Sequence, residues 1–247
     1  MSEKYNPRTI ETKWQSYWNE NKTFHSELDP KKKKYYIGSC KHSDISTFSL
    51  HPLKPITTGE GGIVTTNNNL LAKKIKQFRS HGIIRHSKFH WKYDILSYGF
   101  NYRLSDINSA LGISQLEKII FFLKKRKKIY EYYKTKLNNY KNLINFPKYN
   151  EKNKPSYHLV LISIDFKNLK KNKDDFLKYL YKNNIISQFH YIPIYNFKTF
   201  ETKKKKLKNS EEYHASTLSI PIYHSLKNKD QNLIINVIKK FFKYSKN

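Results

Sequence analysis

Glycine is confined to one stretch of this chain, which limits where the backbone can turn tightly. All seven glycines lie between residues 38 and 112, and three of them fall within residues 57–62. Glycine is costly to order and is used where the backbone turns sharply or passes close to a ligand. Ser49, His51 and Lys54 stand just before this cluster, at the end of an expected strand. A hydroxyl, an imidazole and an amine at a strand-to-turn junction form a candidate site, although the glycines alone also fit a plain hairpin.

The spacing of apolar residues predicts a mixed α/β chain. Strands are expected at 45–50 and 61–66, then a helix over 69–80 and a long helical stretch that Ser105 caps, running from Asp106 to Tyr140. A polar, proline-containing linker is expected at 147–155. After it the expected order is strand (158–165), helix (174–183), strand (187–194), strand (217–222) and helix (231–244).

The chain divides into three parts by composition and apolar pattern. Residues 1–37 carry an apolar stripe at helical spacing and then a lysine-rich tail with a short strand candidate at 35–37; the stripe is Ile10, Trp14, Tyr17 and Trp18. Residues 38–150 hold every glycine and the longest helical pattern. Residues 151–247 contain the strands and helices after the linker. We therefore predict a helical N-terminal segment, a larger middle domain and a small C-terminal α+β domain.

The charge balance is strongly basic. Lys and Arg number 48 against 19 Asp and Glu, for a formal net charge of +29. Such a balance raises the hypothesis of a nucleic-acid or anionic-membrane partner, because clustered cations attract polyphosphates. Only five of the basic residues are arginines, the type suited to reading phosphates and bases through two parallel hydrogen bonds. The excess of lysine fits the codon usage of an AT-rich genome better, so nucleic acid is not the expected partner.

Cys40 is the only cysteine, which excludes an internal disulfide and favours a reducing compartment. We expect its thiol to be a small buried side chain. No apolar run approaches the ~20 residues of a membrane span, and the N-terminus lacks a hydrophobic signal core. The sequence therefore predicts a cytoplasmic protein without a membrane partner, and it indicates no metal site.

Several short runs from Gly38 onward resemble a known enzyme family. They include Gly38-Ser39-Cys40, the segment Phe48-Ser49-x-His51-Pro52-x-Lys54-Pro55-Ile56 with the glycine cluster after it, Phe78-Arg79-Ser80-His81-Gly82, Asn101-Tyr102-Arg103-Leu104-Ser105 and His190-Tyr191-x-Pro193. These runs resemble the DegT/DnrJ/EryC1/StrS sugar aminotransferases. Within that family the likeness is greatest to the transaminases of pseudaminic acid synthesis, which aminate a UDP-linked keto-deoxy sugar with glutamate.

The resemblance implies an α/β fold: the C-terminal part of a pyridoxal-phosphate type I aminotransferase large domain, incomplete, over 38–150, and a small α+β domain over 151–247. It implies pyridoxal 5'-phosphate as cofactor and Lys54 as the catalytic Schiff-base lysine, a role that suits an amine able to lose its proton. It also implies that the Ser49 hydroxyl binds the cofactor phosphate and that Asn101 reaches that phosphate from the other subunit of a homodimer. The implied substrates are a nucleotide-linked keto sugar and an amino-acid donor. His51 and His190 are left open between a role near a sugar pocket and plain packing.

The chain departs from the family pattern at its N-terminal end. The first half of the family's large domain should supply a phosphate-binding turn, an aromatic ring against the cofactor and an aspartate for its ring nitrogen, and these features are not found in the sequence. Residues 1–37 instead resemble the N-terminus of leucyl-tRNA synthetase, through Tyr5-Asn6-Pro7-Arg8 and Lys13-Trp14-Gln15-x-Tyr17-Trp18. We therefore expect a truncated, chimeric chain that joins near residues 37 and 38 and exposes apolar surface.

Three functions follow from these observations. The first is transamination of a nucleotide-linked sugar. The second is a non-catalytic aminotransferase remnant that keeps the folding pattern and a dimer surface. The third, favoured least, is an RNA-binding fragment, motivated by the net charge and by residues 1–37.

Overall fold

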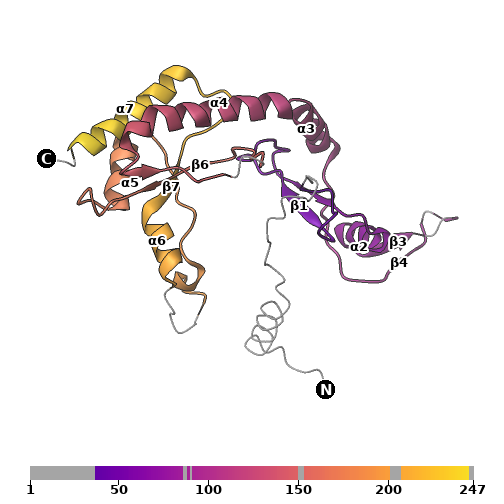
Figure 1. The fold of residues 1–247 in the computed structure, drawn as a ribbon. Helices are drawn as coiled ribbons and strands as arrows, with labels where there is room; N and C mark the ends of the chain where they lie inside the picture. Colours follow the sequence, from indigo (N-terminus) through magenta and orange to yellow (C-terminus); the bar gives the residue numbers. More distant parts are fainter. Residues whose placement is uncertain (1–36, 86–87, 90, 150–152, 201–206, 245–247) are drawn as a thin grey trace.

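The computed structural model describes residues 37–85, 88–89, 91–149, 153–200 and 207–244. The expected N-terminal helix, and residues 35 and 36 of the short expected strand, lie outside the described residues. Ile37 itself lies in a turn and is 83% exposed. Figure 1 shows two parts joined by a long helical arch.

The first part consists of two antiparallel hairpins and one helix. β1 (Ser46–Ser49) pairs with β2 (Gly62–Thr65), and β3 (Ile83–Arg85) pairs with β4 (Tyr93–Ile95). α2 (Asn69–Arg79) follows β2 in the chain, and the Asn68 side chain caps it by accepting from the N–H groups of Leu70 and Leu71. The expected strands at 45–50 and 61–66 and the expected helix at 69–80 are confirmed. The β3–β4 hairpin was not expected from the sequence.

This first part buries very little apolar surface. Before Ile129, the buried hydrophobic residues in the described chain are Leu50 and Phe122. Large apolar side chains are instead exposed on α2, on β4 and on the segment that follows it; among them are Leu70 at 69%, Ile95 at 65% and Tyr98 at 97%. This agrees with the expectation that the chain leaves apolar surface uncovered.

Two helices, not one, connect the parts. α3 (Asp106–Glu117) begins at Ser105, whose hydroxyl accepts from the Asn108 N–H at 3.2 Å, so the expected cap is confirmed. α3 ends at Lys118, where the backbone N–H bonds to the carbonyls of Gln115 and Leu116 instead of the carbonyl four residues back. α4 (Ile119–Leu137) then starts a new helix, and a 3₁₀ turn, η1 (Asn138–Tyr140), extends it. The expectation of one long helical stretch is corrected by this break.

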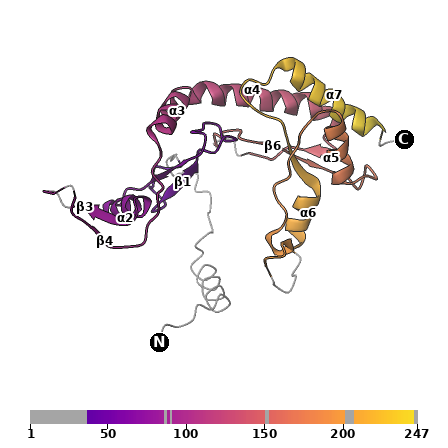
Figure 2. The ribbon, with the colours of Figure 1, turned by 180° about the vertical axis from the view of Figure 1, so that it is seen from behind.

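The second part is built on a three-stranded antiparallel sheet of order β5-β6-β7. Its strands are β5 (Ile144–Asn145), β6 (Val160–Ile164) and β7 (Thr217–Ile220), with Val160 opposite Ile220 and Ile144 opposite Ile164. The helices are α5 (Lys173–Lys182), α6 (Lys208–Ser216) and α7 (Asn228–Tyr244). α4 and α7 lie on one side of the sheet and α6 on the other (Figures 1 and 2).

The hydrophobic core lies between the sheet and helices α4, α5 and α7, and α6 contributes no residue to it. Alternate residues of β6 face it, and Phe176 of α5 packs on Phe241 of α7 with ring centroids 4.8 Å apart. The core also takes in the second half of α4, from Ile129 to Leu137, and β5. These residues come before the expected domain boundary between 150 and 151 but share one core with the residues after it. The division of the chain at 150 and 151 stays a prediction.

One expected strand in this part is wrong. Over 187–194 the chain makes a single bridge, from Gln188 to Ser219 of β7, and then leaves the sheet. Pro193 has no N–H with which to continue a strand ladder, and a 3₁₀ turn, η2 (Ile194–Asn196), begins after it. β5 and α6 were not expected. No helix in the described part of the chain is long and apolar enough to cross a membrane.

Candidate functional site

The loop between β1 and β2 is closed at its base by Leu50. The Leu50 N–H donates to the carbonyl of Gly61 at 2.9 Å, and the Leu50 carbonyl accepts from the Thr58 N–H at 3.1 Å and from the Thr57 hydroxyl at 2.9 Å. Leu50 is 4% exposed, so these bonds lie in a protected position. The loop is therefore held in one shape at its base, and the segment that carries Lys54 projects from it.

Thr58 fixes this loop against helix α3. Its side chain is 1% exposed, and its hydroxyl donates to the Glu60 carbonyl at 2.8 Å. A Cβ atom on Gly61, where φ is +155°, would lie 2.4 Å from the Thr58 hydroxyl oxygen, and a Cβ atom on Gly112 of α3 would lie 2.8 Å from the Thr58 methyl group. Two glycines thus make room for one threonine. The sequence pointed to the glycine cluster but not to this contact with α3.

Ser49 and His51 lie at the start of the loop. The exposed Ser49 hydroxyl accepts from the His51 N–H at 3.4 Å, and the His51 Nδ1 accepts from the Leu53 N–H at 3.2 Å. The His51 Nε2 is 3.8 Å from a carboxylate oxygen of Glu60. These contacts give His51 a local role in shaping the turn, while the O–H of Ser49 is not used as a donor within the described residues.

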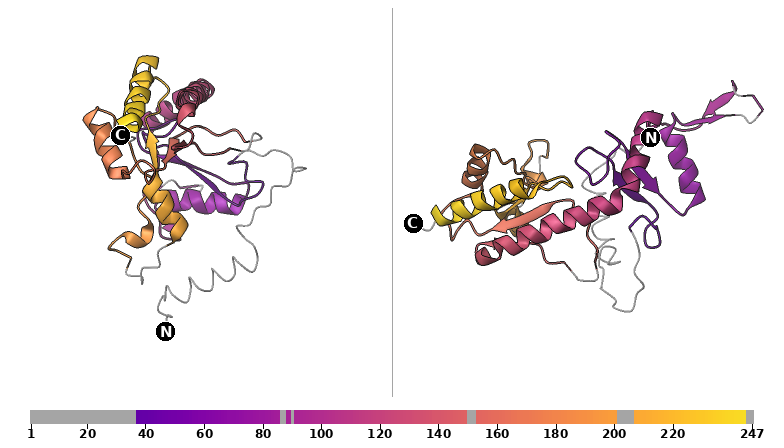
Figure 3. Two further views of the ribbon diagram at one scale, coloured as in Figure 1. Left: turned by 60° about the vertical axis from the view of Figure 1, so that its left-hand side comes forward. Right: turned by 90° about the horizontal axis from the view of Figure 1, so that it is seen from above.

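Lys54 lies at the far end of the turn. Its N–H donates to the His51 carbonyl at 2.9 Å, and its side chain is half-buried. Within the described residues its amine has no hydrogen-bond partner or ion pair. The loop lies below the junction of α3 and α4, beside the segment that leads into β6 (Figures 1 and 3).

Asn101 is placed by a different set of contacts. It forms an isolated bridge with Ser80, directly after α2, and its side chain is exposed. The segment around Gly82 and the segment 97–99 are in close contact. A Cβ atom on Gly82 would lie 1.8 Å from the Ser97 carbonyl oxygen, and one on Gly99 would lie 2.3 Å from the Gly82 nitrogen. Asn101 therefore has a fixed position on the surface, and its contact with a second subunit stays a prediction.

A group of basic residues lies where β6 and β7 meet α4, and the sequence did not single it out apart from His190. Arg126 is 5% exposed, and its Nη1 donates to three backbone carbonyls, those of His158 at 3.1 Å and of Tyr157 and Ile222 at 3.4 Å each. These carbonyls lie just outside the paired ends of β6 and β7. The guanidinium therefore holds the ends of the two strands together.

The histidines of this group are poor proton acceptors from solvent. Burial lowers the pKa of His158, and the neighbouring basic groups Lys54, Arg126 and His190 lower it further. Burial also lowers the pKa of His190, whose Nε2 lies 2.8 Å from the Ser219 hydroxyl. The Nδ1 atoms of both rings are buried and have no hydrogen-bond partner among the described residues. Both pKa shifts favour the neutral imidazole.

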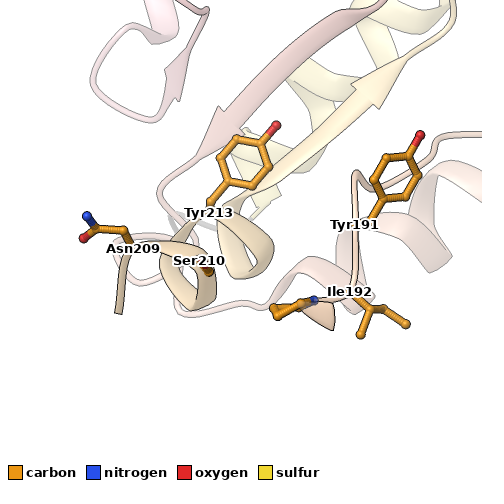
Figure 4. A pocket seen from close by; sticks show the side chains of 6 residues that line it. Tyr191, Ile192, Asn209, Ser210 and Tyr213 are labelled. Atoms are coloured by element: carbon orange, nitrogen blue, oxygen red, sulfur yellow. The ribbon is translucent and has the colours of Figure 1, made fainter. Parts of the chain in front are cut away.

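A shallow hollow in the described residues lies elsewhere. It is open, measures about 370 Å³, and lies between the segment after His190 and helix α6. Figure 4 shows Tyr191 on one side of it and Tyr213 on the other; Ile192, Pro193, Asn209 and Ser210 complete its lining. It contains none of Lys54, Ser49 and Asn101, so it does not define the candidate site. In the described residues no group of three or more histidine, cysteine or carboxylate side chains could hold a metal ion.

Comparison with known proteins identifies the family that the sequence motifs indicated. A model of the DegT/DnrJ/EryC1/StrS aminotransferase family matches residues 32–239. The chain belongs to this family. The matched range covers the Lys54 loop, the Asn101 segment and almost all of the second part.

Relatives within the family include enzymes that act on sugar nucleotides. A UDP-4-amino-4,6-dideoxy-N-acetyl-beta-L-altrosamine transaminase of Campylobacter jejuni is 37% identical over 202 residues, which are 80% of this chain and 52% of the relative. The structure of Helicobacter pylori PseC, an aminotransferase involved in the biosynthesis of pseudoaminic acid, matches with a TM-score of 0.76 and 34% identity, over 82% of this chain and 54% of that one.

A more distant likeness shows the fold and names a cofactor for the relative. A sugar aminotransferase of Streptococcus pneumoniae, solved in a PLP-form, matches with a TM-score of 0.72 and 22% identity, over 85% of this chain and 55% of that one. The chain spans about half the length of the curated relatives it matches. Its α/β fold is accordingly that of about half of a sugar aminotransferase.

Proposed function

We propose that this chain carries the lysine half of a pyridoxal-phosphate-dependent site for amination of a nucleotide-linked keto sugar, with an amino acid as donor. The observation that carries the proposal is the Lys54 loop, which Leu50 closes and Thr58 fixes to α3. A lysine that reacts with a carbonyl group needs a set position and a partly desolvated amine. The backbone of Lys54 is fixed by its hydrogen bond to the His51 carbonyl, and the residue is half-buried.

An amine, a hydroxyl and an amide are the types of group that can bind the aldehyde and the phosphate of pyridoxal phosphate. Pyridoxal phosphate, when bound, acts as an electron sink for the carbon next to the amine. Lys54 would hold its aldehyde carbon. The Ser49 hydroxyl, whose O–H is not used within the described residues, would donate to its phosphate. The Asn101 amide would donate to the same phosphate from a second copy of the chain, which makes the homodimer part of the proposal.

A specific observation favours a second candidate, a non-catalytic aminotransferase remnant. The chain spans about half the length of its relatives, and its first part leaves large apolar side chains exposed. A scaffold of this kind keeps the loop and its lysine without the remaining contacts to the cofactor. The two candidates differ in whether Lys54 reacts selectively.

Borohydride reduction of the protein with pyridoxal phosphate, followed by peptide mapping, separates the candidates. The proposal expects the label on Lys54 in preference to the other lysines, and loss of that label in Lys54→Ala. Lys178→Ala, a change at an exposed lysine of α5, is the matched control and should leave the pattern unchanged. Ser49→Ala should weaken the preference for Lys54, while Ser43→Ala, at another exposed serine, should not. Uniform labelling of the lysines in the wild-type protein would favour the remnant.

A further inference from the structure

The Lys54 loop and the segment before β6 are positioned by the same helical pair. Thr58 fixes the loop to Gly112 of α3, and Arg126 of α4 holds the carbonyl of His158 at 3.1 Å. The two segments lie next to each other below the α3–α4 junction (Figures 1 and 3). The Lys54 loop and the segment that carries His158 therefore both depend on the α3–α4 pair for their position.

The two side chains are complementary in their unused hydrogen-bonding groups. The Nδ1 of His158 is buried and has no partner among the described residues. A buried polar atom without a partner costs free energy, so one is expected nearby. Lys54 offers three N–H donors on a flexible stem, and in the described chain its amine has no hydrogen bond of its own.

The groups around His158 favour its neutral imidazole, the form that can accept a hydrogen bond. Lys54, Arg126 and His190 are the charged or titratable groups that act on His158, all of them basic, and together with burial they lower its pKa. A neutral imidazole carries one ring nitrogen that accepts and one that donates. Arg126 also has an unpartnered Nε, but its guanidinium is already committed to three carbonyls, whereas the Lys54 stem can move.

We infer that His158 is a positioning residue for Lys54, and that its Nδ1 accepts a hydrogen bond from the Lys54 amine before the cofactor binds. This inference rests on the proposed role of Lys54. His158 would hold the amine toward the half-buried side of the loop, away from solvent, and would itself touch neither cofactor nor substrate. The contact orients the amine and gives the buried ring nitrogen its missing partner.

The first test compares three proteins in the labelling assay with pyridoxal phosphate. His158→Leu removes the acceptor and should lower the preference for Lys54 about tenfold, the size expected for one hydrogen bond to a charged group. His158→Asn places an amide oxygen near the position of Nδ1 and should restore most of the preference. Selective labelling of Lys54 that is equally strong in His158→Leu would overturn the inference while leaving the proposed function intact.

The second test needs no cofactor. The His158 imidazole is titrated by NMR in the wild-type chain, in Lys54→Met and in the control Lys92→Met. The His158 pKa should rise by about one in Lys54→Met, because a donor and a positive charge are removed, and should not move in Lys92→Met. An unchanged His158 pKa in Lys54→Met rules out the contact, even if wild-type labelling proves unselective and the proposed function fails. Unfolding midpoints of all variants show whether a loss of labelling comes from loss of the fold.

Discussion

Arg126 should contribute more to the stability of this chain than any other single basic residue of α4. Its Nη1 makes one hydrogen bond of 3.1 Å and two of 3.4 Å to carbonyls at the ends of β6 and β7. Hydrogen bonds to a charged group contribute about 1.5–3 kcal/mol each when short. We count about 2 kcal/mol for the short bond and about 1 kcal/mol for each long one. The buried, unpartnered Nε offsets about 1 kcal/mol of this total.

The expected loss in Arg126→Ala is therefore about 3 kcal/mol in the free energy of unfolding. For a chain of this size that corresponds to a fall of roughly 6–12 °C in Tm. Urea unfolding followed by circular dichroism measures the change, with Lys125→Ala, at the exposed neighbouring position, as control. Arg126→Lys keeps the charge but loses the planar fork, and should fall between the two. If Arg126→Ala is no more destabilised than Lys125→Ala, the three carbonyl contacts do not hold the strand ends together.

Two further predictions concern the loop and the histidines. Gly61→Ala places a Cβ 2.4 Å from the Thr58 hydroxyl oxygen, at a φ of +155°, whereas no atom lies within 4 Å of the Cβ that Gly59→Ala adds. Gly61→Ala should therefore reduce selective labelling of Lys54 more than Gly59→Ala does. Equal effects would show that the contact with Thr58 is unimportant. Three histidines have a lowered pKa in the folded chain: His158, His190 and His224. Below the ordinary histidine pKa of about 6.5 the unfolded chain therefore binds more protons than the folded chain, and the free energy of unfolding should fall as the pH drops. Urea midpoints between pH 5 and 7.5 check this, and His158→Gln should flatten the dependence.

The elements that the sequence predicted correctly are those with strong local signals. β1, β2, α2, β6, α5, β7 and α7 carry clear apolar periodicity, and the Ser105 cap marked the start of α3. The break at Lys118 left no such signal, because neither a glycine nor a proline stands there and apolar residues resume directly after it, from Ile119 to Leu123. The segment 187–194 has strand-like composition, yet only Gln188 pairs, with Ser219 of β7. Pro193 has no N–H to donate to a neighbouring strand.

The candidate site could be located from sequence only along the chain, not in space. Motif resemblance indicated Lys54, Ser49 and Asn101, which lie on separate segments, and these roles stay predictions. Arg126 and His158 could not be found in this way, because their relation to Lys54 depends on how α3 and α4 bring distant segments together. An arginine within a run of lysines on a helix also gives no local sign that it is the buried one.

The uneven distribution of buried side chains has a consequence for how folding of this protein is measured. Every member of the hydrophobic core lies from Ile129 onward, while the loop with Lys54 belongs to the part with little core. Regions with few buried apolar contacts open at lower free energy than the rest of a molecule. A sharp thermal transition would therefore report on the C-terminal half alone. Only amide hydrogen exchange of residues before Phe122, observed separately, can show whether the lysine loop is ordered when that transition begins.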